Sequence, residues 1–360
     1  MSRFHRIAIL AGAVMSAATL AATIAVPAQA ASTPGWRIFY RHHYGLASQY
    51  SAYYAVVAPG KGDAWAFGTS NAALRSEPVA ARWNGRRWRP ASLPAGLTDV
   101  IEAASAPSSS DIWAISGLGQ YVLHWNGKKW SVAKRWTTSG ENELTGVTAF
   151  SATNVWVFGG PGFSGGLGTW HYNGHRWTEI GGAASGLEGA SALSPRNIWA
   201  IGSRLSPGDS VVHDNGKSWT RVSAATLDNA QFGGIVALSR TDVWVVGRAA
   251  GGQPAALAVN WNGKRWRKVA VPWKLQLGQV ISDGQGGLWM TASSFGLPSV
   301  SWVLHRSKSG TWTRTRTASG MSWGPGELAA IPGTHALWGA GIAGTKTGSD
   351  GAIFAHGSVG

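Results

Sequence analysis

Three glutamates share one position in a repeated pattern, and carboxylates placed in this way could bind a cation. Glu102, Glu188 and Glu327 each lie eleven residues before a tryptophan of a phrase that recurs along the chain. If the fold brings the three together, each negative charge raises the pKa of the others unless a cation intervenes. Carboxylate oxygens from several segments suit Ca²⁺. The pattern therefore suggests a ligand or calcium site, with carboxylates that simply lie in water as the alternative, and no other cofactor is evident.

Four histidines recur in a similar manner, each just ahead of a predicted hairpin turn. They are His124, His171, His213 and His305. On separate repeats they cannot converge on one metal ion, whose nitrogen ligands must lie within about 2 Å. We expect them to pack or to form hydrogen bonds at strand ends.

Glycoside hydrolysis requires two carboxyl groups held about 5 to 10 Å apart. The one pair that is close in sequence is Glu141 and Glu143, and its polar loop favours solvated side chains. The cluster His42–His43–Tyr44 could contact a ligand, but a solvated loop fits it better. The absence of cysteine excludes a thiolate nucleophile and a cysteine metal site. The sequence thus assigns no catalytic residue and favours a protein that is not an enzyme.

Basic residues outnumber acidic ones by 31 to 16, and several follow a recurring Asn-Gly pair. The clearest are Arg86, Arg87, Lys128, Lys129, Lys264 and Arg265. In register they would form a basic ring that attracts an anionic polymer, such as teichoic acid, an acidic polysaccharide or extracellular DNA, through its electric field. We expect such a contact without specific nucleic-acid recognition; cations that only solvate turns are the alternative.

A repeat with a central tryptophan positions all of these residues. Phrases such as "DIWAIS" (111–116) and "NVWVFG" (154–159) carry it, at spacings of 48, 43, 43, 45, 45 and 49 residues. The tryptophans are Trp65, Trp113, Trp156, Trp199, Trp244, Trp289 and Trp338. Units of this length match the four-stranded blades of β-propellers. The predicted fold is all-β: one seven-bladed propeller of antiparallel four-stranded blades over residues 31–360.

One unit, 145–180, illustrates the predicted strand order. Strand A is 146–151, strand B is 155–160, strand C is 169–172 and strand D is 177–180. Asn-Gly between strands C and D favours a tight hairpin because both residues tolerate positive φ. The Asp or Asn ahead of strand B is expected to cap the A–B turn. These residues are Asp63, Asp111, Asn154, Asn197 and Asp242.

The two ends of the chain complement each other. The seventh unit ends with strand C (352–357), and the segment 35–40 precedes the first strand A. Trp36 stands where the other units have the first tryptophan of strand D. We expect the N-terminal strand to pair with 352–357 and complete the last blade, because closure removes an exposed sheet edge.

Residues 1–30 are typical of a secretory signal peptide. Arg3 and Arg6 precede the apolar run 7–26, and "AQA" (28–30) fits a cleavage site. The run is long enough to span a membrane, so a retained anchor is the alternative. No later segment is apolar enough for a membrane helix. The expected product is a secreted, extracellular monomer.

The hairpin "HDNGKSWT" (213–220) resembles a degenerate form of the Asp-box of sialidase-type propellers, with a histidine before Asp214 and no box serine. The tryptophan phrases are also similar to secreted propeller repeats of high-GC Gram-positive bacteria, over about residues 36–358. A sialidase-like activity would imply three arginines, a tyrosine–glutamate pair and an acidic general acid. "WRIF" (36–39) matches the arginine-bearing motif poorly and the rest has no counterpart in register, so no catalytic residue is carried over.

The favoured function is a secreted, non-catalytic binding or scaffold propeller that recognises a glycan, a cell-wall polymer or a protein through one loop face. The predicted loops 68–78, 202–210, 247–256 and 343–350 differ between units while the scaffold phrases repeat, as in a recognition surface. The alternatives are a carbohydrate-active enzyme, namely a glycoside hydrolase of sialidase-like type, and a structural envelope protein.

Overall fold

The computed structural model describes most of the chain after residue 34. The described ranges are 35–42, 50–72, 75–137, 143–160, 166–202, 211–222, 226–227, 230–249, 255–295, 300–317, 324–344 and 349–359. The proposed signal peptide (1–30) lies outside them, as do Glu141, His43 and Tyr44. Within these ranges, no helix is long and apolar enough to cross a membrane.

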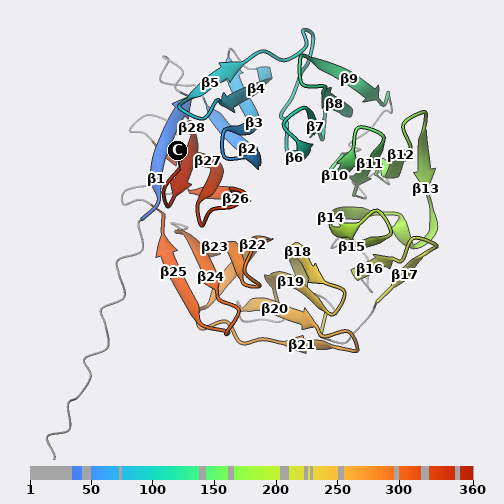
Figure 1. Cartoon of the computed structure of the whole chain (residues 1–360), viewed down its shortest axis with the longest axis vertical. Coiled ribbons are helices and arrows are strands. Elements are labelled where there is room, and N and C mark those ends of the chain that lie inside the picture. The colour runs from blue at the N-terminus through green and yellow to red at the C-terminus, as the bar shows by residue number, and fades with distance from the viewer. Residues whose placement is uncertain are drawn as a thin grey trace, which may run out of the picture. The chain divides into compact units, whose positions relative to one another are not determined.

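Seven four-stranded antiparallel sheets stand as blades around a central opening, so the fold is a seven-bladed β-propeller, as predicted (Figure 1). In every blade the strands pair in the order A, B, C, D, with strand A nearest the centre. The unit chosen above folds as expected, and its observed strands differ from the predicted ones by one residue at most.

The blades are numbered in chain order, and one short 3-10 helix, η1 (Gly182–Ala184), precedes the fourth. Blade 1 has β2 (Ser51–Gly60), β3 (Asp63–Ala72), β4 (Arg75–Trp83) and β5 (Trp88–Ala91). Blade 2 has β6 (Ala103–Ser108), β7 (Asp111–Ser116), β8 (Tyr121–Trp125) and β9 (Trp130–Arg135). Blade 3 has β10 (Gly146–Ser151), β11 (Asn154–Gly159), β12 (Gly168–Tyr172) and β13 (Trp177–Ile180). Blade 4 has β14 (Leu187–Ser194), β15 (Asn197–Gly202), β16 (Val211–Asp214) and β17 (Trp219–Arg221).

The remaining three blades continue this pattern until the last one. Blade 5 has β18 (Gln231–Ser239), β19 (Asp242–Arg248), β20 (Ala256–Trp261) and β21 (Trp266–Lys268). Blade 6 has β22 (Leu275–Ser282), β23 (Leu288–Ser294), β24 (Ser301–Arg306) and β25 (Trp312–Arg316). Blade 7 has β26 (Pro325–Ala330), β27 (Leu337–Gly344), β28 (Ser349–His356) and, as its strand D, β1 (Arg37–His42).

The N-terminal strand closes the ring as predicted. Strand β1 pairs antiparallel with β28, from Arg37 opposite Ala355 to His42 opposite Gly351. Trp36, which precedes β1, is 5% exposed, and its ring centroid lies 5.3 Å from that of His356. Closure therefore buries the indole that the sequence pattern singled out.

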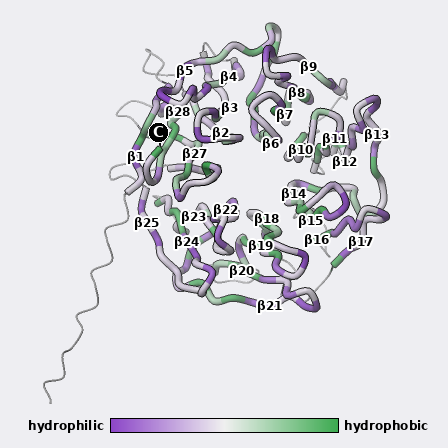
Figure 2. The backbone as a smooth tube through the Cα atoms, viewed as in Figure 1, coloured by the Kyte–Doolittle hydropathy of each residue, from purple (hydrophilic) through white to green (hydrophobic). Residues whose placement is uncertain are grey.

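The hydrophobic core lies between blades rather than within one of them. Seven clusters of buried residues each join two neighbouring blades, including the pair formed by blades 7 and 1. Trp83 of blade 1, for example, packs against Trp338 of blade 7 at 5.1 Å between ring centroids. Strands β7 and β15 are buried along their whole length, because blades cover both of their faces. Figure 2 shows how apolar and polar segments alternate along the blades.

In blades 2 to 6 a serine, rather than the Asp or Asn of strand B, caps the A–B turn. The hydroxyl oxygens of Ser108, Ser151 and Ser239 each accept a hydrogen bond from the backbone N–H two residues further on. The predicted Asp or Asn cap is therefore wrong. The sequence correctly predicted that these side chains lie beside the turn. It did not predict their hydrogen-bond partners, because the side chains extend toward strand C instead of the turn backbone.

The C–D turns also differ from the expected geometry. Each Asn-Gly turn spans four residues, and only its glycine has a positive φ, such as 85° at Gly127. In blade 2 the side-chain oxygen of Asn126 accepts hydrogen bonds of 3.0 Å from the backbone N–H groups of Lys128 and Lys129. This side-chain cap lets the asparagine keep an ordinary backbone conformation, so the expectation of two residues with positive φ is wrong.

Up-and-down strands place the A–B and C–D turns at one end of the blades and the B–C and D–A connections at the other. We call these ends the turn face and the loop face. In blade 2, residues 108–111 and 126–129 belong to the turn face, whereas 116–121, 136–137 and 143–145 belong to the loop face.

Candidate functional site

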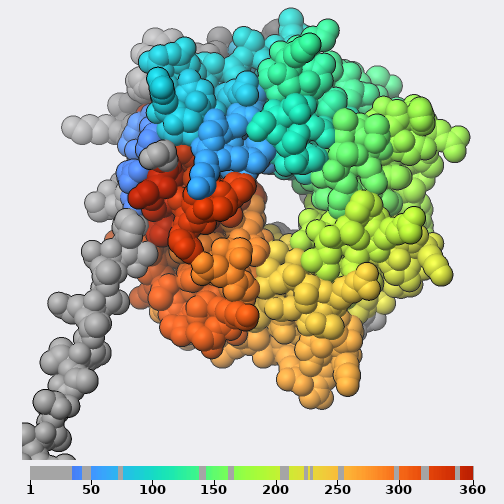
Figure 3. Space-filling model, viewed as in Figure 1, coloured from blue at the N-terminus to red at the C-terminus, as the bar shows by residue number. Residues whose placement is uncertain are grey.

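The starts of the seven A strands surround a channel through the ring, which contains a cavity of about 830 Å³ (Figure 3). At the register position of the three glutamates, every residue lines either this cavity or a pocket at its mouth. These residues are Tyr54, Glu102, Thr145, Glu188, Gly233, Gly278 and Glu327. The structure thus places the three glutamates beside the channel.

The pocket at the channel mouth opens on the loop face and has a volume of about 440 Å³. Glu102 from blade 2 and Glu327 from blade 7 both line it, together with Tyr54 of blade 1. Among the described residues, no lysine or arginine lines this pocket or the channel cavity. The carboxylates therefore lie in an environment that provides them with no cationic side chain.

Glu102 lies immediately before strand β6, where its backbone N–H donates to the carbonyl of Ile115 at 3.0 Å. Burial raises the pKa of its carboxyl to about 7, and the charges of Glu143 and Asp99 add to the effect. The floor beneath the carboxylate is Gly117, where any side chain would collide with it. The local sequence therefore provides space for this carboxylate and leaves it without a counter-charge.

Glu327 lies in strand β26 and is partly open to the channel. Burial raises the pKa of its carboxyl to about 8, so the group holds a proton at neutral pH. The expectation that the glutamates raise one another's pKa is wrong. Burial is the largest cause at both positions, and the charges that add to it at Glu102 are those of Glu143 and Asp99.

Glu188 lines the channel cavity from blade 4, with its side chain close to Gly160 of blade 3. In the described part of the chain, no group of three or more acidic or histidine side chains could hold a metal ion. The three glutamates therefore share a channel without forming a group of this kind.

The turn face carries the basic residues that the sequence identified. Arg86, Arg87, Lys128, Lys129, Lys264 and Arg265 are all exposed in C–D turns. Each of these turns is held by its asparagine through the backbone, so the side chains extend into solvent. Blade 7 has no such turn, because its strands C and D come from opposite ends of the chain. The predicted basic ring is therefore an arc over blades 1 to 6.

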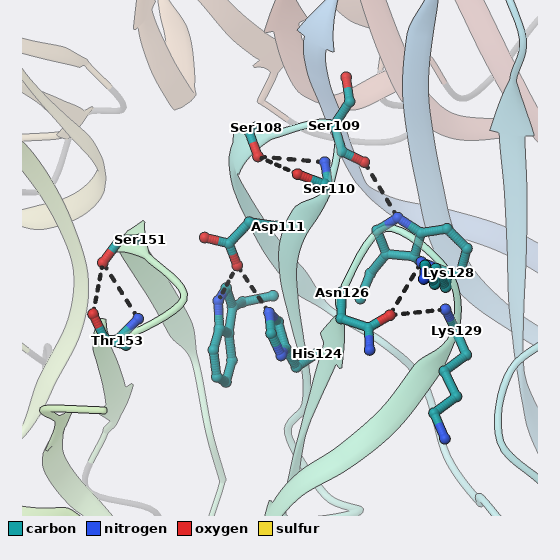
Figure 4. Close-up of polar contacts among 12 residues, drawn as sticks. Ser108, Ser109, Ser110, Asp111, His124, Asn126, Lys128, Lys129, Ser151 and Thr153 are labelled. Atoms are coloured by element: carbon teal, nitrogen blue, oxygen red, sulfur yellow. Dashed lines mark hydrogen bonds and ion pairs between the residues drawn. The ribbon is translucent and has the colours of Figure 1, made fainter. Parts of the chain in front are cut away.

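The acidic residues at the turn-face end are treated differently, because each one accepts hydrogen bonds within its own blade. Asp111 Oδ1 accepts from Trp113 Nε1 and from His124 Nε2, both at 2.9 Å (Figure 4). Equivalent contacts join Asp63 to Arg82, Asn154 to His171, Asn197 to His213, Asp242 to Asn260 and Asp283 to His305. The histidines therefore form strand-end hydrogen bonds, as expected.

Asp283 shows the electrostatic result of this pairing. Burial raises the pKa of its carboxyl, but hydrogen bonds from His305 and from the backbone N–H groups of Gln285 and Gly287 outweigh burial and hold the pKa below its usual value. The turn face is thus cationic at its surface, because its carboxylates are occupied beneath it.

Sequence reasoning missed a pocket between blades 1 and 2, which Arg82 lines. Arg82 occupies the position opposite the strand B tryptophan that holds histidine in blades 2, 3, 4 and 6. The substitution of arginine for histidine at this register position was the signal that could have identified it.

No protein-family model matches the chain, and no curated protein matches it. Solved propeller structures do. The structure entitled "YCF48 bound to D1 peptide" has 12% sequence identity and a TM-score of 0.60, over 91% of this chain and 100% of that one. A catalytically inactive virginiamycin B lyase from Staphylococcus aureus with quinupristin has 12% identity and a TM-score of 0.62, over 88% and 99%. The RRP9 WD40 repeats have 10% identity and a TM-score of 0.60, over 90% and 98%. At these identities the likeness establishes the propeller fold alone.

Proposed function

We propose that this chain is an exported, non-catalytic binding propeller whose turn face holds an anionic polymer of the cell surface. Export is supported by the signal-peptide pattern of residues 1–30. A binding role is supported by the fold, since similar propellers include one solved with a bound peptide. The loop face, with its variable connections, remains available for a protein or glycan partner.

The distribution of charge on the turn face carries this proposal. Twelve exposed lysines and arginines lie in its A–B and C–D turns: Lys61, Arg86, Arg87, Lys128, Lys129, Arg176, Arg196, Lys217, Arg240, Lys264, Arg265 and Lys308. The aspartates beneath them are hydrogen-bonded inside the blades. Among the described residues of these turns no carboxylate is exposed, and fixed positive charge of this kind gives a field that attracts polyanions of many sequences.

Retention on a polyanion at increasing salt tests the proposal. The mature protein should bind dextran sulfate beads and not plain dextran, and it should elute as salt rises, because binding releases condensed counterions. The variant Lys264→Gln/Arg265→Gln should elute at lower salt. The slope of log affinity on log salt should fall by on the order of one for each sulfate group that is no longer neutralised.

The matched control removes two exposed charges from the outer strands near the loop face, in Arg221→Gln/Arg316→Gln. It has the same net charge as the turn-face variant and should elute close to wild type. Equal elution of the two variants would attribute binding to net charge and reject the turn face as the contact surface.

The mouth pocket supports a second candidate function, a glycoside hydrolase. Glu102 and Glu327 line one pocket, and burial raises their pKa values to about 7 and about 8. A carboxyl group that stays protonated at neutral pH is what a general acid requires. Release of reducing ends from polysaccharides by wild type, with loss of activity in Glu102→Gln and Glu327→Gln, would support hydrolysis; no release from substrates that the protein binds would reject it.

A further inference from the structure

We propose that the pocket between blades 1 and 2 is a discrete binding site for an anionic sugar residue, that is, a sugar ring carrying a carboxylate or a phosphate. The inference rests on the proposed function, since it identifies one place on the turn-face side where a unit of the polymer is held. The other basic residues of the turn face would then contribute only a non-specific electrostatic attraction for the polymer.

The pocket has a volume of about 540 Å³ and is built from both blades. Blade 1 supplies Arg82 from β4 and Arg89 from β5, and blade 2 supplies Lys128 and Lys129 from its C–D turn. Four cations therefore approach one cavity, and among the described residues no acidic side chain lines it.

Arg82 is held rigidly at the base of this arrangement. Its Nε donates to Asp63 Oδ1 at 2.9 Å. Its guanidinium lies 5.0 Å from the ring centroid of Trp65 in its own blade and 5.4 Å from that of Trp125 in the next. Such stacking fixes the plane of the guanidinium.

The fixed guanidinium retains free donors. An arginine has five N–H groups, and the contact with Asp63 occupies the one on Nε. Within the described part of the chain, the terminal nitrogens form no hydrogen bond, and 39% of the side chain is exposed. A preorganised guanidinium with free terminal N–H groups suits a carboxylate or a phosphate.

The other blades show that this guanidinium is not required by the fold. At the same register position His124, His171 and His213 stack on their tryptophans at 4.1 to 4.3 Å and use Nε2 on an Asp or Asn. Histidine therefore satisfies the structural role, and arginine adds free donors at this one position.

The balance of charge favours an anion. Asp63 offsets Arg82, whereas Arg89, Lys128 and Lys129 form no ion pair with any described residue. Three positive charges therefore face the pocket without compensation, and the site attracts a negative group.

The walls favour a ring as the carrier of that group. Pro90, Leu93 and Pro94 line the pocket, together with three largely buried tryptophans, Trp65, Trp125 and Trp130. Apolar walls with a few polar groups are typical of small-molecule sites of this volume. A sugar ring can lie against these apolar walls while its anionic group meets the cations, whereas an aspartate or glutamate side chain offers little apolar surface, so we favour a sugar ring over an acidic peptide.

Calorimetric titration of the mature protein tests the site with four small probes: glucuronate, glucose 6-phosphate, glucose and inorganic phosphate. The two anionic sugars should bind with one site per chain, and more tightly than either control. Arg82→His, which reproduces the residue of the other blades, should weaken them by about tenfold. Lys264→Gln/Arg265→Gln, on the same face but away from the pocket, should change their affinity by less than about twofold.

A second variant keeps the test sound if Arg82→His is unstable, since Lys128→Gln/Lys129→Gln alters only exposed side chains and should also weaken the anionic sugars. Three results would each overturn the inference: anionic sugars that bind no better than the controls, equal weakening in the Lys128/Lys129 and Lys264/Arg265 variants, or tighter binding of a tetraglutamate peptide at the same residues. If the chain is retained on dextran sulfate but fails with the small sugars, the site is wrong and the proposed function stands. If the sugars bind but the beads do not retain the chain, the site stands and the proposed function is wrong.

Discussion

Carboxylates at the two ends of the blades meet opposite environments. At the turn-face end Asp111 and Asp283 accept hydrogen bonds from histidine, and Asp283 also accepts them from the backbone. At the loop-face end Glu102 and Glu327 line a pocket without cationic side chains, and burial raises their pKa values. The same functional group therefore supports the structure where its charge is matched, and stays available for chemistry where its charge is not.

Opening of the ring should have the largest effect, because only a closed ring brings the first residues of the A strands together around the channel. Deletion of residues 31–40 removes the first four residues of β1 and exposes sheet edges in blade 7. The protein should aggregate or melt at least about 10 °C lower. A thermal scan checks this, and a melting temperature equal to that of the intact chain would show that β1 does not close the ring.

Removal of a matched carboxylate should have the next largest effect. Asp111→Ala leaves the N–H groups of Trp113 and His124 without an acceptor, which costs about 2 to 4 kcal/mol. Asp111→Asn is the control that the chain itself offers, because Asn154 and Asn197 fill this position in blades 3 and 4. Urea unfolding should show a loss below about 1 kcal/mol for asparagine; an equally small loss for alanine would mean that the contact contributes nothing.

Removal of an unmatched carboxylate should stabilise the protein. The pKa of Glu327 is about 8 in the fold and near 4.5 in the unfolded chain, so the folded state keeps a proton that the unfolded state releases. Stability from this group is complete below pH 4.5 and is lost as pH rises through 8. Glu327→Gln should therefore raise the melting temperature by about 2 °C at pH 8 and hardly at all at pH 4.

The opposite slope should appear at Asp283, whose pKa is lowered in the fold. A depressed pKa gives stability that is present above the unfolded value of 3.8 and is lost as pH falls through the folded value. Asp283→Asn should weaken the dependence of the melting temperature on pH, and it should do so only at acid pH. If Glu327→Gln and Asp283→Asn change the melting temperature in the same pH range, the contrast between the two faces does not hold.

His356 should show the smallest effect and marks an exception at the turn-face end. Both of its ring nitrogens lack a hydrogen-bond partner among the described residues, and burial lowers the pKa of the imidazole. Its contribution is present above pH 6.5 and declines as pH falls, because the unfolded chain takes up the proton first. His356→Phe should reduce the loss of melting temperature between pH 6.5 and 5 by about 1 °C.

The sequence predicted the fold and the channel well because both depend on periodicity. Equal spacing from the tryptophans placed Glu102, Glu188 and Glu327 beside the channel, and Trp36 marked the closing strand. The direction in which a side chain points was harder to predict. The position of Asp111 next to a turn did not reveal that its side chain reaches His124.

Contacts between repeats were the hardest to predict. The pocket of Arg82 depends on Trp125 and Lys128 of the following blade. An alignment of the repeats compares equivalent positions and does not show which residues of neighbouring repeats are in contact. The common cause of the misses is that a repeat pattern records what each blade shares, whereas a site between blades depends on what one blade lacks.

The pairing of β1 with β28 also sets the order in which the chain can fold. Arg41 and its partner Asp350 are separated by 309 residues, so β1 has no strand to pair with until β28 has been synthesised. Blades 1 to 6 contain only strands close together in the chain and can form as they emerge, whereas the seventh must form last. A nascent chain that stops before β28 would therefore carry one unpaired strand and an open ring, however complete its other blades.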